Sequence, residues 1–397
     1  MPKLKLALIV PGGFDSDRDD GVIPALLELA LELTARHEVH VFAASGPGPT
    51  RHHQRQGVQI HQIGDPRHIE PADIARRSLE WSRLGWRLMR EIEQMACPTG
   101  FHLLHSFWAA GPGLMAGILG RRFRIPVVLS IGGGEAVWLP RIGYGGSGSK
   151  VGRMRLALTL RLANEVTVGS DFARARLNPG AAARTHVIPW GVNCEQFLAP
   201  AMRPAGPPWR LLHVASLNRV KDQRTLLDAF AVVVARLGDV RLECVGEDTL
   251  QGEVQKYADA LGLGSRVHFL GFQSQGTLAR LYREAHLLVQ SSLYESQGVV
   301  VLEAAAAGLP TVGTAVGLLP MLAPQAGFCV PPGDSKCLAD AICRLLLDGP
   351  GRETMALAAQ QFARNHDRAW TARTFEALYQ GLVLPRGGFV SEPRRPP

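Results

Sequence analysis

Two glutamates separated by seven residues are the most informative chemical feature of this sequence. Glu295 and Glu303 lie in the segment YESQGVVVLEAAAAGLP, where Gly298 separates them and Gly308 and Pro310 follow an alanine-rich run. The run predicts a helix that ends near Gly308, so Glu295 should precede the helix and Glu303 should lie inside it. A carboxylate here could accept hydrogen bonds from sugar or ribose hydroxyls, and the helix start could offer N–H groups to an anion. The alternative interpretation is a solvated pair of glutamates on a surface helix.

A second candidate group combines two cations with the start of another predicted helix. Arg219 and Lys221 precede residues 222–237, whose apolar side chains recur at helical spacing. Two cations and the positive end of a helix would suit a diphosphate, whose charge they would neutralise. The alternative is a pair of ordinary surface charges.

A third candidate is the glycine pair that ends the first apolar run. Gly12 and Gly13 follow a predicted strand and precede a predicted helix. Glycine lets the backbone approach a phosphate or a sugar closely, and a helix start favours an anion. The pair does not have the GxGxxG spacing of dinucleotide-binding folds.

The elements that must position these residues alternate between short apolar runs and longer helical patterns. This alternation is typical of parallel sheets built from β-α-β units, and it occurs twice. In the first half we predict a helix at 21–36 and strands at 4–10, 39–43, 103–105, 127–130, 166–169 and 186–189. In the second half we predict a helix at 222–237 and strands at 210–214, 241–245, 267–270, 287–290 and 311–313. The stretch 201–209 between the halves, AMRPAGPPW, indicates a linker.

The predicted fold class is α/β, with two doubly wound Rossmann-like domains that face each other across a cleft. Open α/β sheets bind ligands beyond the carboxyl ends of their strands. Function should therefore lie in the loops that follow strands.

Composition narrows the class of protein. A chain of 397 residues with 46% hydrophobic and 20% charged residues is typical of a globular protein of about two domains, which excludes overall disorder. An excess of 43 Lys and Arg over 35 Asp and Glu gives a net charge of +8, which favours an anionic partner: nucleotide phosphates, nucleic acid or acidic lipid. The six cysteines have neither zinc-site spacing nor disulfide-scaffold density, so we expect a reduced, cytoplasmic chain. The start MPKLKLALIV is interpreted as a buried strand, since no apolar stretch approaches the ~18 residues that span a bilayer.

The segment with the two glutamates resembles the E-x7-E signature of retaining glycosyltransferases of family 4, two-domain GT-B enzymes that use nucleotide-sugar donors. The similarity covers most of the chain and keeps the order of the family's motifs. The other matching segments are PGGFDSDRDDG, VTVGSDFAR, VIPWGVNCEQF, LLHVASLNRVKDQRTLLDAF and GFCVPPGD. The resemblance therefore implies the GT-B fold.

The resemblance also implies roles on the donor side. Glu303 would bind the ribose hydroxyls, and Glu295 with the backbone after it would contact the transferred sugar. Lys221 is a firmer assignment to the diphosphate than Arg219, because Ser216 stands where the family's usual arginine is expected. The implied donor-binding residues are Gly12, Gly13, Arg219, Lys221, Glu295, Ser296, Gly298, Val299 and Glu303.

On the acceptor side, the resemblance points to a histidine near the reacting sugar. His105 is preferred to His102, although a lone histidine at a strand end is more often structural. A second family histidine is replaced by Phe107, and Gly132 replaces a histidine in the segment SIGGGE. The implied catalytic residues are His105, Lys221 and Glu295, and the implied acceptor-side residues are Asp20, Gly133, Gly134 and Glu135.

Metal binding is considered for one loop and not favoured. Asp15 and Asp17 form a D-x-D pattern, which holds a metal in the other large glycosyltransferase fold, but Arg18 lies next to them. Since the resemblance implies a GT-B enzyme, which needs no metal, we expect an acceptor-side loop without an ion. No metal site and no other cofactor are predicted.

The resemblance implies that the two domains bind different substrates. Residues 1–200 would form an acceptor-binding domain and 205–365 a nucleotide-sugar-binding domain. A helix at 366–384 would pack back on the first domain, and 385–397 would form a mobile tail. The implied reaction is retaining, metal-independent transfer of a hexose to a hydroxyl of a saccharide or lipid-linked acceptor, as in polysaccharide and cell-envelope biosynthesis.

A basic amphipathic segment raises the question of membrane contact. Between residues 76 and 95 the apolar residues fall on one helical face, four arginines gather on another, and Trp86 lies outside the apolar stripe. Such a helix could rest on an anionic membrane, on the inner face of the cell membrane, and bring the cleft to a lipid-linked acceptor. The alternative is an ordinary helix of the first domain whose arginines face water.

Other functions remain compatible with the same fold. One is a GT-B epimerase or a sugar-phosphate-using synthase, and another is a non-catalytic nucleotide-sugar-binding protein. No recognised nucleic-acid motif accompanies the arginine-rich composition, so we expect no nucleic-acid partner. The sequence leaves the donor base, the sugar, the acceptor and the oligomeric state open.

Overall fold

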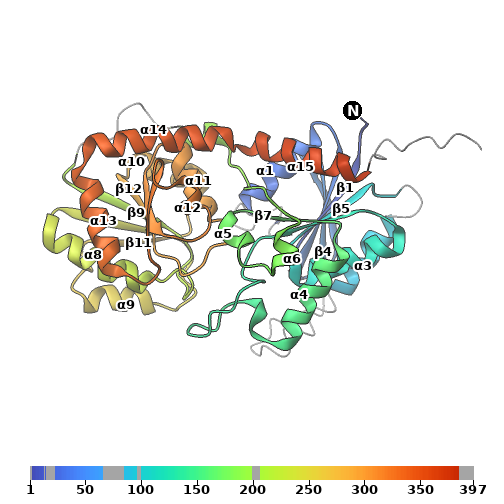
Figure 1. Ribbon diagram of the computed structural model, residues 1–397, viewed down its shortest axis with the longest axis horizontal. Coiled ribbons are helices and arrows are strands. Elements are labelled where there is room, and N and C mark those ends of the chain that lie inside the picture. The colour runs from blue at the N-terminus through green and yellow to red at the C-terminus, as the bar shows by residue number, and fades with distance from the viewer. Residues whose placement is uncertain are drawn as a thin grey trace, which may run out of the picture.

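The computed structural model describes residues 2–12, 14, 23–65, 85–95, 100–198 and 206–383, and two lobes make up this part of the chain (Figure 1). Each lobe is built around one mainly or wholly parallel sheet with helices packed against it. The predicted fold class is therefore confirmed. The proposed tail at 385–397 and most of the proposed linker lie outside the described residues.

The first sheet has eight strands in the order β3-β4-β2-β1-β5-β6-β7-β8. Continuous apolar runs such as that of β1 are buried because helices cover both faces of a parallel sheet. Its strands are β1 (Lys5–Val10), β2 (Glu38–Pro47), β3 (Arg51–Arg55), β4 (Val58–Asp65), β5 (Leu103–Phe107), β6 (Val127–Ile131), β7 (Glu165–Val168) and β8 (Thr185–Val187). The strand order reverses between β1 and β5, so the loops after these two strands border the crevice where open α/β sheets bind ligands.

The second sheet has six parallel strands in the order β11-β10-β9-β12-β13-β14. Its strands are β9 (Trp209–Val214), β10 (Val240–Val245), β11 (Val267–Gly271), β12 (Leu287–Gln290), β13 (Thr311–Thr314) and β14 (Gly327–Val330). Here the order reverses between β9 and β12. The loops after β9 and β12 carry Lys221 and Glu295, so the topology brings the two candidate charges to one crevice.

The helices predicted at 21–36 and 222–237 are present. The longer ones in the first lobe are α1 (Pro24–Thr34), α3 (Leu114–Phe123), α4 (Lys150–Leu162) and a helix at 85–95. Those of the second lobe are α8 (Gln223–Leu237), α9 (Glu253–Ala260), α10 (Gln275–Glu284), α11 (Val299–Ala306), α13 (Ser335–Leu347) and α14 (Gly349–Asn365). Short helices are α5 (Asp171–Arg174), α6 (Pro179–Ala182), α7 (Cys194–Phe197), α12 (Leu319–Leu322), a π-helix at Ala109–Gly113 and a 3-10 turn at Gly146–Gly148. No helix among the described residues is both long and apolar enough to cross a bilayer.

Three strands were not predicted. β3 and β4 form an antiparallel hairpin at the edge of the first sheet, joined at Gln56 and Gly57, whose φ angles are 48° and 90°. β3 has the sequence RHHQR, without the apolar run used to recognise strands, because an edge strand can be polar. β14 is only four residues long and precedes Pro331 and Pro332.

The last helix, α15 (Arg368–Val383), leaves the second lobe and packs on the first (Figure 1). Its Phe375 and Tyr379 are fully buried in the core that includes α1 and β1. Arg368 Nε pairs with Glu32 Oε1 of α1 at 2.9 Å, and Thr371 Oγ1 donates to the Pro189 carbonyl at 2.7 Å. The core of the first lobe is therefore closed by a helix from the far end of the described chain.

His105 lies beneath α15. Its Nδ1 lies 2.6 Å from Tyr379 Oη, and its Nε2 lies 2.8 Å from Ser130 Oγ. The ring is fully buried, and burial lowers its pKa to about 3. His105 is therefore neutral at pH 7 and joins α15 to the sheet through two hydrogen bonds.

This contact predicts the effect of Tyr379→Phe. Removal of the hydroxyl leaves one imidazole nitrogen buried without a partner, which costs about 1–3 kcal/mol. The free energy of unfolding, measured by urea denaturation, should fall by this amount. Tyr257→Phe is the matched control, because Tyr257 Oη donates to Asp228 at 2.7 Å in a half-buried position. Equal losses in both variants would contradict a special contribution from the His105 contact.

Candidate functional site

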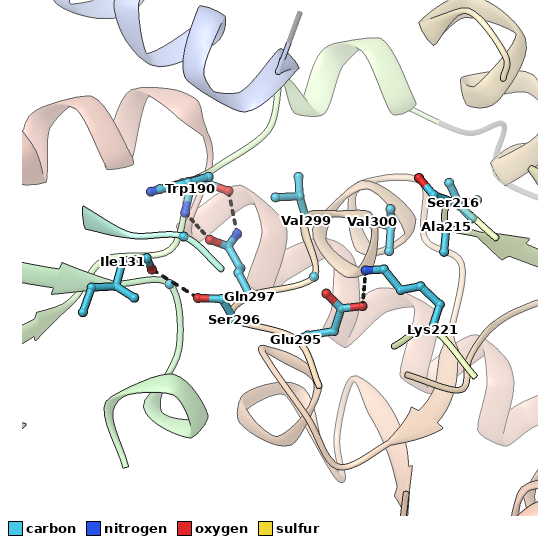
Figure 2. Close-up of a pocket in the computed structure, with 14 residues that line it drawn as sticks. Ile131, Trp190, Ala215, Ser216, Lys221, Glu295, Ser296, Gln297, Val299 and Val300 are labelled. Atoms are coloured by element: carbon cyan, nitrogen blue, oxygen red, sulfur yellow. Dashed lines mark hydrogen bonds and ion pairs between the residues drawn. The ribbon is translucent and has the colours of Figure 1, made fainter. Parts of the chain in front are cut away.

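Lys221 and Glu295 form an ion pair at the carboxyl ends of β9 and β12. Lys221 Nζ lies 2.6 Å from Glu295 Oε1 (Figure 2). Ser292 Oγ donates to the same oxygen at 2.7 Å. The side chains are 23% and 11% exposed, so both keep access to the crevice. Asp222, the next residue, caps α8 by accepting from Thr225 N at 3.4 Å. The cap fixes where the chain turns after Lys221.

The ion pair lines a cavity of about 260 Å³ between the two lobes. The second lobe contributes the loops after β9 and β12 and the first turn of α11. The first lobe contributes Ile131, Gly132, Gly169 and Trp190. α11 begins after Gly298, whose φ of 78° suits glycine, and no side chain caps its first turn. The cavity thus combines a cation, a carboxylate and the positive end of a helix.

A larger cavity of about 590 Å³ adjoins the cavity of the ion pair. Val214, Ala215, Ser216, Val299 and Val300 line both cavities, so the two are neighbours. The larger one extends from the start of α1 to the loops after β10 and β11 and to Glu303 in α11.

Glu303 is a buried carboxyl group with one hydrogen bond from a side chain. Tyr282 Oη donates to its Oε2 at 2.7 Å, and the residue is 6% exposed. Burial raises the pKa of Glu303 to about 7, and the bond from Tyr282 opposes this rise. The group is therefore poised between its acid and its carboxylate form near neutral pH, and donors that favour the carboxylate would ionise it.

The loop between β12 and α11 is tied to the first lobe by its polar groups. Gln297 Nε2 donates to the Trp190 carbonyl at 2.9 Å, and its Oε1 accepts from Trp190 N at 2.8 Å (Figure 2). Ser296 Oγ donates to the Ile131 carbonyl at 3.2 Å, and Ser170 Oγ donates to the Ser296 carbonyl at 2.5 Å. The position of Glu295 therefore depends on both lobes.

The glycine-rich segment after β6 faces the same region. Glu135 accepts from Gly133 N at 2.8 Å and from Ala109 N at 3.1 Å, so both of its oxygens hold the backbone of the first lobe. Burial raises the pKa of Glu135, and these backbone donors oppose the rise. Tyr294 Oη donates to the Gly133 carbonyl at 3.0 Å, and a side chain at Gly134 would meet the Tyr144 ring. Glu135 thus shapes the wall of the crevice.

The structure brings most of the predicted donor-side residues together. The smaller cavity is lined by Lys221, Glu295, Ser296, Gly298 and Val299, and the larger one by Val299 and Glu303. Gly13 and Asp20, with Asp15 and Asp17, lie outside the described residues.

Six predicted residues that the structure describes do not line these two cavities: Gly12, His105, Gly133, Gly134, Glu135 and Arg219. Arg219 is exposed and lines a separate cavity of about 360 Å³ with Arg224. Gly12 is half-buried, with its α-carbon close to the Ala44 carbonyl. His105 is in the core and Glu135 holds its own loop, so neither faces the ion pair directly.

Sequence reasoning missed the residues that join the lobes. Gln297 stands inside the signature and Trp190 inside another quoted motif, but nothing in the spacing indicates that they bond to each other. Gln290 was also missed: its amide is 4% exposed, lacks a described hydrogen-bond partner and lies below Gly298. Trp108 has a φ of 70°, which is uncommon for a residue with a side chain, and its ring packs against Gly132 and Gly133.

Comparison with known proteins identifies the same two halves. The family model described as Glycosyltransferase Family 4 matches residues 20–196, and that described as Glycosyl transferases group 1 matches residues 208–348. The D-inositol 3-phosphate glycosyltransferase of Corynebacterium diphtheriae is 31% identical over 225 residues, which cover 52% of this chain and 52% of that protein. The chain spans about half the length of the curated relatives it matches.

Solved structures share the whole fold. Sucrose-phosphate synthase from Thermosynechococcus elongatus superposes with a TM-score of 0.74 at 20% identity, over 95% of this chain and 99% of that chain. Anabaena Alr3699/HepE in complex with UDP-glucose gives a TM-score of 0.71 at 20% identity, over 95% and 100%. The family matches cover both sheets and the structural matches share their arrangement, so the chain belongs to glycosyltransferase family 4 and has the GT-B fold.

Proposed function

We propose that this protein is a retaining glycosyltransferase that moves a hexose from a nucleotide-diphosphate donor to a hydroxyl of a saccharide or lipid-linked acceptor. The observation that carries the proposal is the Lys221–Glu295 pair, which lines a cavity between the lobes beside the uncapped start of α11. The printed names of the relatives support it: one curated relative is a glycosyltransferase, and one structural neighbour holds UDP-glucose.

The donor diphosphate would lie between Lys221 and the first turn of α11. Its negative charge would attract the Lys221 ammonium, and the backbone N–H groups of α11 would donate to its oxygens. Ser216 lines both cavities but has no charge. Among the described side chains that line the smaller cavity, Lys221 is the one cation. Glu295, once Lys221 turns to the phosphate, would accept from a hydroxyl of the transferred sugar.

The nucleoside would occupy the larger cavity. Glu303 lines it and has a second carboxylate oxygen available beside the one that accepts from Tyr282. Two adjacent ribose hydroxyls match such an acceptor, and their hydrogen bonds would favour the ionised form of Glu303.

The proposed step retains configuration at the sugar carbon without a protein nucleophile. The bond from that carbon to the diphosphate oxygen breaks, and the acceptor oxygen bonds to the carbon from the same face. The acceptor proton passes to the departing phosphate oxygen. Lys221 and the start of α11 stabilise the charge of the leaving nucleotide, which is the role that a metal has in other enzymes, so no catalytic metal is required in this proposal.

Lys221→Ala and Glu303→Ala test the site. Loss of charge stabilisation at the leaving group should lower kcat for Lys221→Ala by about 10²–10³-fold. Glu303→Ala should lower turnover by orders of magnitude as well, because the nucleoside is no longer held in register. Lys256→Ala, an exposed lysine on α9, is the matched control and should retain wild-type turnover.

The assay should follow both products, with UDP-, GDP- and ADP-sugars and a panel of acceptors, in buffer containing EDTA. Acceptor-dependent release of the nucleoside diphosphate with formation of a glycoside supports transfer. Conversion of the donor without an acceptor would favour an epimerase, and binding without turnover would favour a non-catalytic protein. Near-wild-type transfer by both alanine variants would refute the assignment of these residues.

Glu303 also predicts how nucleotide affinity varies with pH. The pKa of Glu303 is raised to about 7 in the free protein, and ribose hydroxyls should lower it in the complex. Affinity for UDP should therefore rise with pH, by up to about tenfold per unit below pH 7, and level off above it. Calorimetry in buffers of different ionisation enthalpy should detect proton release at pH 6–7. Glu303→Gln should remove this dependence, and an unchanged slope in that variant would rule Glu303 out.

Membrane contact is a further part of the proposal. In the described helix 85–95, Leu88 and Ile92 are buried in the core while Trp86 is 65% exposed. Arg87 donates to the Gly64 carbonyl, so this arginine helps to hold the helix on the sheet. Arg76, Arg83, Trp81 and Leu84 lie outside the described residues. The exposed tryptophan beside Arg90 supports peripheral binding to anionic lipid.

Sedimentation with anionic liposomes checks this contact. At low salt the wild-type protein should pellet with vesicles that contain phosphatidylglycerol, and Trp86→Ala should pellet less. Trp138→Ala, at a tryptophan that is 45% exposed elsewhere in the first lobe, is the control. If wild-type protein stays in the supernatant at low salt, the membrane proposal fails.

A further inference from the structure

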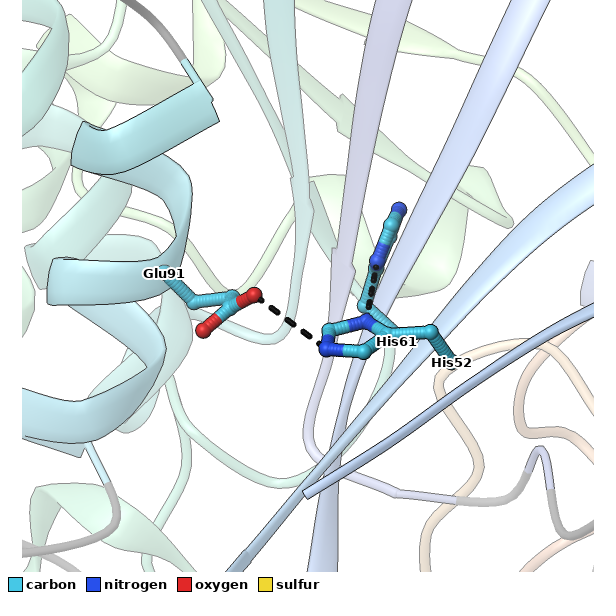
Figure 3. Close-up of side chains that lie close together, drawn as sticks. All are labelled: His52, His61 and Glu91. Atoms are coloured by element: carbon cyan, nitrogen blue, oxygen red, sulfur yellow. Dashed lines mark hydrogen bonds and ion pairs between the residues drawn. The ribbon is translucent and has the colours of Figure 1, made fainter.

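A cluster of histidines lies in the first lobe, on three neighbouring strands near the edge of the sheet. His40 comes from β2, His61 from β4 and His52 from the edge strand β3. Glu91 approaches from the helix at 85–95 (Figure 3). None of the four lines either cavity of the crevice, and the proposed transfer reaction uses none of them.

The side chains form one continuous chain of polar contacts. Glu38 Oε1 lies 2.9 Å from His40 Nε2, and His40 Nδ1 lies 3.0 Å from His61 Nε2. His61 Nδ1 lies 2.9 Å from His52 Nδ1, and His52 Nε2 lies 3.5 Å from Glu91 Oε1. A carboxylate therefore stands at each end of a row of three imidazoles.

Counting protons along this row leaves one position without a donor. Glu38 can only accept, so His40 Nε2 must donate, and the Nδ1 of a neutral His40 must accept from His61 Nε2. His61 Nδ1 then carries a lone pair, which accepts from His52 Nδ1 without an ion and would bind an ion when one is present. The Nε2 of a neutral His52 consequently also carries a lone pair, which faces the Glu91 carboxylate. Two acceptors that face each other at 3.5 Å favour a donor or a cation between them, either a water molecule or a metal ion.

We propose that His52, His61 and Glu91 bind a divalent first-row metal ion, with Zn²⁺ as the best match. One ligand atom from each residue lies within 4.8 Å of the other two, a separation that small side-chain adjustments around one ion can close. Two imidazoles and one carboxylate are a common zinc ligand set, and His52, 53% exposed, leaves room for water as a fourth ligand.

The surroundings of His61 resemble the outer shell of a metal site. A metal-binding histidine usually donates its second ring nitrogen to a fixed acceptor, which sets its tautomer. His40 supplies that acceptor for His61 and is itself held by Glu38. Phe42 stacks on the His61 ring, with 4.6 Å between the two ring centroids. Lys5 Nζ is the neighbouring cation, and it lies 3.5 Å from Glu38.

Such an ion would have a structural role. It would join the antiparallel hairpin of β3 and β4 to the helix at 85–95, two elements at the edge of the first lobe. It would not touch the donor, so its removal should affect stability and leave the chemistry of transfer intact.

Metal binding to the full chain, without an affinity tag, tests this site. After treatment with a chelator, the protein should bind one equivalent of Zn²⁺ by calorimetry, and its Tm should rise with the concentration of free Zn²⁺. His52→Gln and Glu91→Gln, both at partly exposed positions, should each weaken binding at least about tenfold, and His40→Gln by about 10–100-fold. His186→Gln is the control, because His186 pairs with Glu165 at 2.9 Å on the surface and should not matter.

Co²⁺ in place of Zn²⁺ gives a readout that does not depend on any variant's folding. Tetrahedral d–d bands without sulfur-to-metal charge transfer support the assigned ligands, whereas a thiolate band would place the metal on a cysteine and overturn the proposal. The proposal also fails if His52→Gln and Glu91→Gln bind Zn²⁺ as the wild type does. No binding at micromolar Zn²⁺ would likewise refute it.

Discussion

The interaction on which the site depends is the attachment of one loop to both lobes. The loop from Tyr294 to Gly298 belongs to the second sheet by sequence, yet its polar groups bond to the backbone of the first lobe. Gly169 has no side chain where Gln297 packs, since a Cβ there would lie 2.4 Å from Gln297 Oε1. Separation of the lobes would leave these buried groups without partners, so the geometry around Glu295 is coupled to the relative position of the lobes.

A small number of charged side chains sets the electrostatic field of the crevice. The net charge of +8 has little bearing on the site, where the field comes from the start of α11 and from the charged side chains that line the two cavities. These side chains are Lys221 and Glu295 in the smaller cavity and Glu28, Arg55, Glu247 and Glu303 in the larger one. In the proposed donor site Ser216 would supply no charge and Arg219 faces a different cavity, so the diphosphate would depend on Lys221. In the proposed complex Lys221 would exchange its pair with Glu295 for the donor phosphate, so the pair holds the ammonium within reach of the site in the free protein.

The sequence predicted what periodicity and strand order determine. All the strands predicted from apolar runs exist, and the topology of β9 and β12 places Lys221 beside Glu295. The direction of a side chain could not be predicted from the sequence. His105 does lie near the end of a strand, but its ring points under α15, toward Tyr379, which is 274 positions away. The edge strand β3 has no apolar residue and β4 has no continuous apolar run, and the histidine cluster depends on the register of three strands. Contacts of this kind are set by tertiary packing, which local patterns do not encode.

The return of α15 to the first lobe has a consequence for synthesis. The ribosome releases the first sheet while Phe375 and Tyr379, which complete its core, are still untranslated. Until residue 383 emerges, the groove beside α1 is open to water and His105 has no Tyr379 to bond. The core of the first lobe therefore cannot be completed until α15 has been made, although its sheet is made first. An apolar groove exposed for that interval is a natural site for chaperones to act.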